Sequence, residues 1–64
     1  MNLVSGVIRE LYVEEEVLMA KVQIRGAYMR VPVTLIDTPR VGDVVLIESG
    51  VAISRIEKEN TLEE

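Results

Sequence analysis

Residues 41–56 read V-G-D-V-V-L-I-E-S-G-V-A-I-S-R-I, and this stretch decides the fold. Gly42-Asp43 and Ser49-Gly50 are dipeptides typical of turns, and each precedes a run of apolar residues. The pattern predicts two β-strands joined by a tight turn. Residues 44–47 alternate only weakly. We therefore predict a central strand covered on both faces, with the C-terminal segment as one of the covers.

The clearest hairpin lies upstream, in residues 18–33. Apolar and polar side chains alternate on both sides of Arg25-Gly26, which is the period of two expected for strands. A two-residue loop at Arg25-Gly26 then sets the following cross-strand pairs: Ile24 with Ala27, Val22 with Met29, and Ala20 with Val31. The loop and the alternation agree on this register independently. We predict that one face of the hairpin turns toward the core, through Val22, Ile24, Met29 and Val31.

The remaining segments extend this pattern over the whole chain. Residues 3–13 predict a long strand, bent or bulged near Gly6, and the three glutamates of residues 14–16 predict a solvated turn. Pro32 cannot donate to a ladder, so its strand should be at an edge of the sheet or end there. Residues 34–40 predict a connecting loop.

Five short strands in so small a chain predict an all-β fold. We expect a five-stranded antiparallel, partly closed β-barrel of the OB type, with an SH3-like barrel as the alternative. The barrel domain should span residues 1–56. Residues 57–64 are acidic and polar, and they predict a short C-terminal helix or a frayed tail.

Size and charge exclude several classes of function. A chain of 64 residues forms one domain and buries only about 60% of its unfolded surface. Its net charge of −4 disfavours binding to nucleic acid, which relies on concentrated Lys and Arg. The first residues lack the basic and apolar regions of a secretory signal, and no stretch approaches the roughly 18 apolar residues of a membrane span. We expect a cytoplasmic protein.

The sequence offers little for catalysis. It contains no His and no Cys, so the commonest general base and the strongest nucleophile are missing. Its four glycines are singly spaced turn residues rather than a phosphate loop. The glutamates of residues 14–16 are better explained as a turn than as a metal site, because no His accompanies them. We predict a binding protein, with no catalytic residue, bound metal or cofactor.

The letters of residues 41–56 resemble those of the HypC/HupF family of hydrogenase maturation chaperones. Members typically read V-G-D-Y-V-L-V-H-x-G-F-A-I-x-R-I at this place, and the resemblance continues through residues 31–40 and, more weakly, to residues 1–3 and 5–6. It implies a small β-barrel followed by a short C-terminal helix. It also implies a chaperone whose partner is a HypD-like maturation protein or the precursor of the hydrogenase large subunit.

The departures from the family concern iron. In the family, the cysteine after Met1 is implicated in holding the iron fragment of the nickel-iron site, and a thiolate is a soft ligand suited to low-spin iron. Here Asn2 occupies that position, provided that a one-residue gap falls between Leu3 and Ser5. Glu48 stands where a His is common. The resemblance therefore implies an adaptor that keeps the scaffold without carrying iron. An iron carrier that uses the Met1 thioether or carboxylates is the alternative, although hard oxygen ligands suit this fragment poorly.

The resemblance also implies where a partner binds. Family members meet their partners through the amino end, and here this end is a largely apolar tip. We predict that a protein partner, or a second copy of this chain, docks on the tip through Met1, Asn2, Leu3 and Val4. Methionine suits such a surface because its side chain is flexible and polarizable.

An OB-type module for an oligonucleotide or another anionic ligand is the alternative function. The hairpin register places Lys21 opposite Arg30 on the outer face, and like charges in that arrangement favour an anionic neighbour. Tyr28 could stack on a base. The candidate ligand-facing residues are Lys21, Tyr28, Arg30 and Glu48. The same charges are also explained by a solvated face that residues 14–16 or the acidic tail neutralise.

Overall fold

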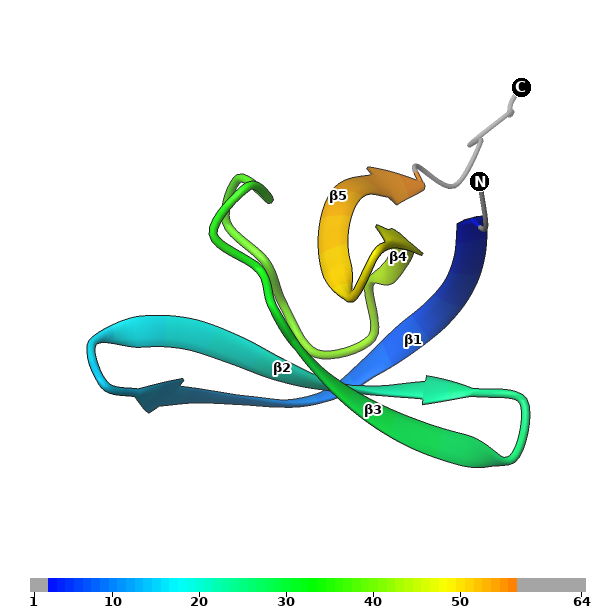
Figure 1. The fold of residues 1–64 in the computed structure, drawn as a ribbon, viewed down its shortest axis with the longest axis horizontal. Coiled ribbons are helices and arrows are strands. Elements are labelled where there is room, and N and C mark those ends of the chain that lie inside the picture. The colour runs from blue at the N-terminus through cyan, green and yellow to red at the C-terminus, as the bar shows by residue number, and fades with distance from the viewer. Residues whose placement is uncertain (1–2, 57–64) are drawn as a thin grey trace, which may run out of the picture.

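The computed structural model describes residues 3–56, and these residues form five β-strands and no helix (Figure 1). The strands are β1 (Leu3–Glu14), β2 (Val17–Ile24), β3 (Ala27–Pro32), β4 (Val44–Glu48) and β5 (Val51–Ile56). All pairings are antiparallel. The predicted all-β fold is confirmed. The predicted helix or tail of residues 57–64 lies outside the described residues.

The strand order within the described sheet is β3-β2-β1-β4-β5 (Figure 1). β1 is the long central strand: its first residues pair with β4, its later residues pair with β2, and Val7 pairs with both. The strongly coiled sheet brings β3 near β5 without any ladder between them. The predicted barrel is therefore not confirmed. β3 ends at Pro32, and the chain continues as a loop instead of adding a strand that would close the gap.

The hairpin of β2 and β3 has the predicted register. Ile24 pairs with Ala27, Val22 with Met29, and Ala20 with Val31. Val22 and Val31 are fully buried, as expected, and Ile24 packs against the core while half-buried. The prediction is wrong for Met29, which is 39% exposed. β3 is the edge strand, so its turn-proximal end lies beyond the elements that cover the inner face.

Gly6 and the bulge of β1 are separate features. The register of β1 against β2 shifts between Ile8 and Glu10, so the bulge lies at Arg9 and not at Gly6. A Cβ at Gly6 would clash with Cγ1 of Val22 and would lie only 2.8 Å from the carbonyl oxygen of Gln23. Gly6 is therefore needed for the close approach of β1 to the end of β2.

The predicted turns are present. Glu15 and Glu16 form the turn between β1 and β2 with φ angles of 51° and 66°, and Ser49-Gly50 joins β4 to β5 with φ angles of 54° and 78°. Two successive positive φ angles are typical of the type I′ turns that join tight hairpins. Each turn thus fits the right-handed twist of its strands.

The core lies on the inner face of the coiled sheet. Its buried residues are all apolar: Ile8, Ala20, Val22, Val31, Val33, Ile36, Val45, Ile47 and Ala52. β4 lies inside the sheet between β1 and β5, as predicted, and contributes Val45 and Ile47 to this core. Its other face, with Val44 and Leu46, is only half-buried among the described residues. The predicted cover on both faces is thus incomplete there.

Candidate functional site

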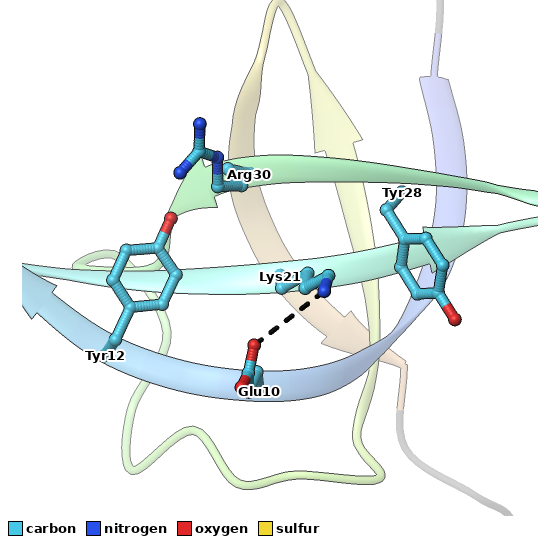
Figure 2. A pocket seen from close by; sticks show the side chains of 5 residues that line it. All are labelled: Glu10, Tyr12, Lys21, Tyr28 and Arg30. Carbon is cyan, nitrogen blue, oxygen red and sulfur yellow. Dashed lines mark ion pairs between the residues drawn. The ribbon is translucent and has the colours of Figure 1, made fainter.

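A shallow pocket of about 500 Å³ lies on the outer face of β1, β2 and β3 (Figure 2). It is lined by Glu10, Tyr12, Lys21, Tyr28 and Arg30. Directly paired residues of neighbouring strands project from the same face of a sheet. The pairs of Glu10 with Lys21 and of Lys21 with Arg30 therefore form one row across the three strands. The structure thus brings together three of the residues that the sequence predicted as ligand-facing.

The two cations of the pocket have different surroundings. The ammonium of Lys21 lies 4.9 Å from the centroid of the Tyr28 ring and 4.0 Å from Oε1 of Glu10. Both members of this ion pair are substantially exposed, so the pair adds little to stability. Within residues 3–56, Arg30 has no ion pair. The guanidinium of Arg30 is therefore the group best placed to meet an incoming anion.

Tyr12 adds an unsatisfied polar atom to the pocket. Its hydroxyl oxygen is shielded from solvent and has no hydrogen-bond partner in the described part of the chain. In Figure 2 this hydroxyl points toward the side of the pocket that Arg30 occupies. A buried hydroxyl without a partner is costly. Because this oxygen is shielded, a ligand would reach it only after a neighbouring side chain moved.

The sequence interpretation missed Glu10 and Tyr12. The signal for them was present, because a two-residue turn at Glu15-Glu16 pairs Tyr12 with Met19 and Glu10 with Lys21 by simple counting. The bulge at Arg9 comes only after these pairs. The side chain of Arg9 donates from Nε to Oε1 of Gln23 at 2.8 Å on the same surface.

Glu48, the fourth predicted ligand-facing residue, lies elsewhere. It is the last residue of β4 and pairs with Leu3, whereas the pocket begins at Glu10. The structure thus groups Glu48 with the predicted docking tip. Leu3 and Val4 are 50% and 38% exposed at the start of β1. Met1 and Asn2 lie outside the described residues, so docking on residues 1–4 stays a prediction.

An apolar surface extends from Leu3 across the outer face of β4 and β5. The pairs of Leu3 with Glu48 and of Glu48 with Val51 form one row. The pairs of Val7 with Val44 and of Val44 with Ile56 form another. We name this surface the outer apolar face and define it by Leu3, Val44, Leu46, Val51 and Ile56. Each of these side chains is half-buried or exposed. Ser5, Glu48 and Ser54 lie on the same face, so its apolar side chains are interspersed with polar ones. Exposed apolar side chains gathered on one face are typical of contact sites for proteins.

The first residues of β1 also have a free edge. In the described sheet, the ladder between β1 and β2 starts only at Val7, so residues 3–6 are paired on the β4 side alone. On the side away from β4, the backbone N–H and C=O groups before Gly6 have no strand beside them in the described sheet. The amino end therefore combines exposed apolar side chains with unpaired backbone.

Asp43 and Arg55, two letters of the segment that decides the fold, have a structural role. Nη1 of Arg55 lies 3.3 Å from Oδ2 of Asp43 and donates to the carbonyl oxygen of Asp37 at 2.9 Å. The backbone N–H of Arg40 donates to the same carboxylate oxygen at 2.9 Å. Together these bonds fasten the long loop between β3 and β4 to β5. Asp43 and Arg55 of the 41–56 motif therefore have a structural role that requires no ligand.

Residues 3–56 offer few groups that could hold a metal ion. No group of three or more His, Cys, Asp or Glu residues converges there in a way that could hold a metal ion. In the same residues, no helix is long and apolar enough to cross a membrane. The side chains that do converge are suited to contacts with anionic and apolar groups.

Comparison with known proteins gives one match. The model of the HupF/HypC family matches residues 4–64, which is nearly the whole chain. No curated protein and no solved structure shows significant similarity to this chain. The match includes the turn and strand motif of residues 41–56, from which the resemblance was inferred. The chain therefore belongs to the HupF/HypC family, whose members are hydrogenase maturation chaperones.

Proposed function

We propose that this protein is a hydrogenase maturation chaperone or adaptor that binds a partner protein through its amino end, without carrying the iron fragment itself. The partner is a HypD-like maturation protein or the precursor of the hydrogenase large subunit. The observation that carries the proposal is the exposure of Leu3 at the start of β1, where it belongs to the outer apolar face. Apolar surface that water does not favour is stabilised when a partner covers it.

The proposal that the protein carries no iron rests on the possible metal ligands near the amino end. The sequence has no cysteine thiolate, and Asn2 offers only a neutral amide. Glu48 is paired with Leu3, so its carboxylate belongs to the neighbourhood of the amino end. A carboxylate is a hard oxygen ligand, whereas the iron fragment prefers soft donors. These donors support partner binding more than iron binding.

Partner capture with matched variants tests the docking surface. The chain would be co-produced with a HypD-like protein or with a large-subunit precursor, and the complex would be measured by size-exclusion chromatography. We expect Leu3→Glu, and deletion of residues 1–4, to abolish the complex, because a charge or a gap disrupts an apolar contact. Leu35→Glu is the control, since Leu35 is 65% exposed on the loop after β3. A complex that survives Leu3→Glu as well as it survives Leu35→Glu would refute docking at the amino end.

Metal analysis and infrared spectroscopy test the statement about iron. We expect the purified native protein to hold no stoichiometric iron and to show no cyanide or carbonyl bands. Asn2→Cys supplies the missing thiolate and should restore some iron retention. Clear cyanide or carbonyl bands from the native protein would show instead that it carries the fragment on other ligands.

The convergence of Lys21, Tyr28 and Arg30 supports a second candidate function, a binding module for an oligonucleotide or another anionic ligand. The exposed ring of Tyr28 could stack on a base. The net charge of −4 and the carboxylate of Glu10 within the pocket count against a polyanion. Titration of the full chain with a short oligothymidine distinguishes this function from that of a chaperone. Saturable binding that Tyr28→Ala abolishes would support the binding module.

A further inference from the structure

β3 is the last strand at one side of the described sheet, so no strand pairs with its outward edge there. The backbone N–H of Val33 donates to the carbonyl oxygen of Leu18 at 3.1 Å, which makes these two residues a hydrogen-bonded pair of the hairpin. Such pairs alternate with non-hydrogen-bonded pairs along an antiparallel ladder. Counting along the observed register, Lys21–Arg30 and Gln23–Tyr28 are non-hydrogen-bonded pairs. The N–H and C=O groups of Tyr28 and Arg30 therefore point away from β2.

This edge is open at its turn-proximal end. Residues 27–30 are all exposed, and Figure 1 shows this end of the hairpin projecting away from β4 and β5. Pro32 is the next residue whose backbone points outward, and it has no N–H to donate. The usable edge thus consists of the four backbone groups of Tyr28 and Arg30, and it is bounded by Pro32.

The same two residues line the pocket with their side chains. A strand added to this edge would place every second side chain beside Tyr28 and Arg30, on the pocket face. The pocket therefore becomes a specificity element for an extended peptide, and the backbone edge supplies the ladder. The coincidence of the free edge with the pocket points to one kind of ligand, a polypeptide segment.

The charges at this place favour an acidic segment, because two cations, Lys21 and Arg30, accompany a single carboxylate, that of Glu10. Arg30 has no ion pair in the part of the chain that is described, and it lies directly across from Lys21 with the same charge. A carboxylate at the pocket would form a charge-assisted contact with the guanidinium of Arg30.

Other occupants fit these observations less well. A second copy paired through its own β3 would bring its Arg30 and Lys21 to the same face, where like charges repel. A nucleic acid has no peptide backbone to extend the ladder. We propose that the free edge of β3 binds an extended acidic segment of a partner protein by strand addition, with a carboxylate of that segment held by Arg30 and Lys21. This site is separate from the amino end and does not rest on the proposed docking there.

The test uses the isotopically labelled full chain and a blocked peptide, acetyl-Thr-Glu-Val-Glu-Val-Thr-amide. We expect its binding to shift the backbone amide signals of Tyr28 and Arg30 and to slow their hydrogen exchange by about tenfold at saturation. Arg30→Gln should weaken binding by about tenfold, because it removes a charge-assisted contact. Arg40→Gln is the matched control: Arg40 is exposed on the loop, and its replacement removes the same charge away from the pocket. It should leave affinity within about twofold.

Three further probes separate the alternatives. The peptide with Lys in place of Glu tests charge, the same acidic peptide with every backbone amide N-methylated tests the ladder, and a short oligothymidine tests nucleic acid. Equal affinity for the Lys peptide or for the methylated peptide would overturn the proposal, as would tighter binding of oligothymidine. Equal weakening by Arg30→Gln and Arg40→Gln would also overturn it. Leu3→Glu should not change peptide binding, so this test fails or succeeds independently of docking at the amino end.

Discussion

The two halves of the sheet share β1, but their outer faces differ in chemical character. The half built from β2, β3 and the later residues of β1 carries cations, a carboxylate and two tyrosines around a shallow pocket. The half built from β4, β5 and the first residues of β1 carries the outer apolar face. A polar surface remains solvated at little cost, whereas an apolar surface of this kind gains from being covered. We propose from this comparison that charge selects ligands at one half and that burial of apolar side chains drives contacts at the other.

The inner faces of the two halves do not differ in this way. The same core connects them, and its buried residues come from both halves. Substitutions on the inner face should therefore affect the whole domain. Those on the outer faces should affect mainly binding.

The largest effect is expected at the inner face of the hairpin. Val22 is fully buried, so Val22→Asp places an unpaired charge in the core. The cost of several kcal/mol approaches the total stability of a domain this small, on the order of 5 kcal/mol. We expect an unfolded protein by circular dichroism. Ile24→Asp should be milder, because Ile24 is half-buried beside the turn. Near-native melting of Val22→Asp would contradict the assigned core.

Gly6 tests the junction between the two halves. A methyl group there would meet Cγ1 of Val22 and the carbonyl oxygen of Gln23, and the backbone oxygen cannot move aside easily. We expect Gly6→Ala to lower the free energy of unfolding by about 3 kcal/mol in a urea titration. Gly26→Ala is the matched control, since a Cβ there has no neighbour within 4 Å in the described structure. Similar losses at both glycines would argue against a close approach at Gly6.

The fastening of the long loop should have an intermediate effect. Asp43→Ala removes the ion pair with Arg55 and the acceptor for the N–H of Arg40. We expect a loss of about 2 kcal/mol in the free energy of unfolding, because a charge-assisted pair that is about three-quarters buried is worth more than a surface pair. Arg40→Ala should cost less than about 0.5 kcal/mol, since only its backbone contributes. An Asp43→Ala variant as stable as Arg40→Ala would show that the loop needs no such fastening.

The smallest effect is expected within the pocket. Glu10→Gln breaks the 4.0 Å ion pair with Lys21, whose partners are both exposed by more than a third. We expect a change of less than about 0.5 kcal/mol in the free energy of unfolding. The same change removes the carboxylate from the pocket, so affinity for the acidic peptide should rise. A large loss of stability would mean that this outer face helps to hold the fold.

Local patterns predicted the hairpins well because their causes are local. The turn residues and the alternation fix the pairing of β2 with β3, and the observed register agrees. The same counting from Glu15-Glu16 would have identified Glu10 and Tyr12 as neighbours of Lys21. The bulge at Arg9 was placed incorrectly, since a glycine in a strand marks either a bulge or a close approach, and only the packing of Gly6 against β2 distinguishes them.

The sequence by itself determined the strands, the turns, the hairpin pairing of strands that follow each other in the chain, and membership of the HupF/HypC family. All of these depend on residues close together in the chain or on their order. Tertiary structure alone decided that the sheet stays open, that Met29 is exposed and that Glu48 lies apart from the pocket. These features depend on how strongly the sheet coils and on which elements meet across it. Such long-range geometry is set by the packing of the whole core, which no local pattern encodes.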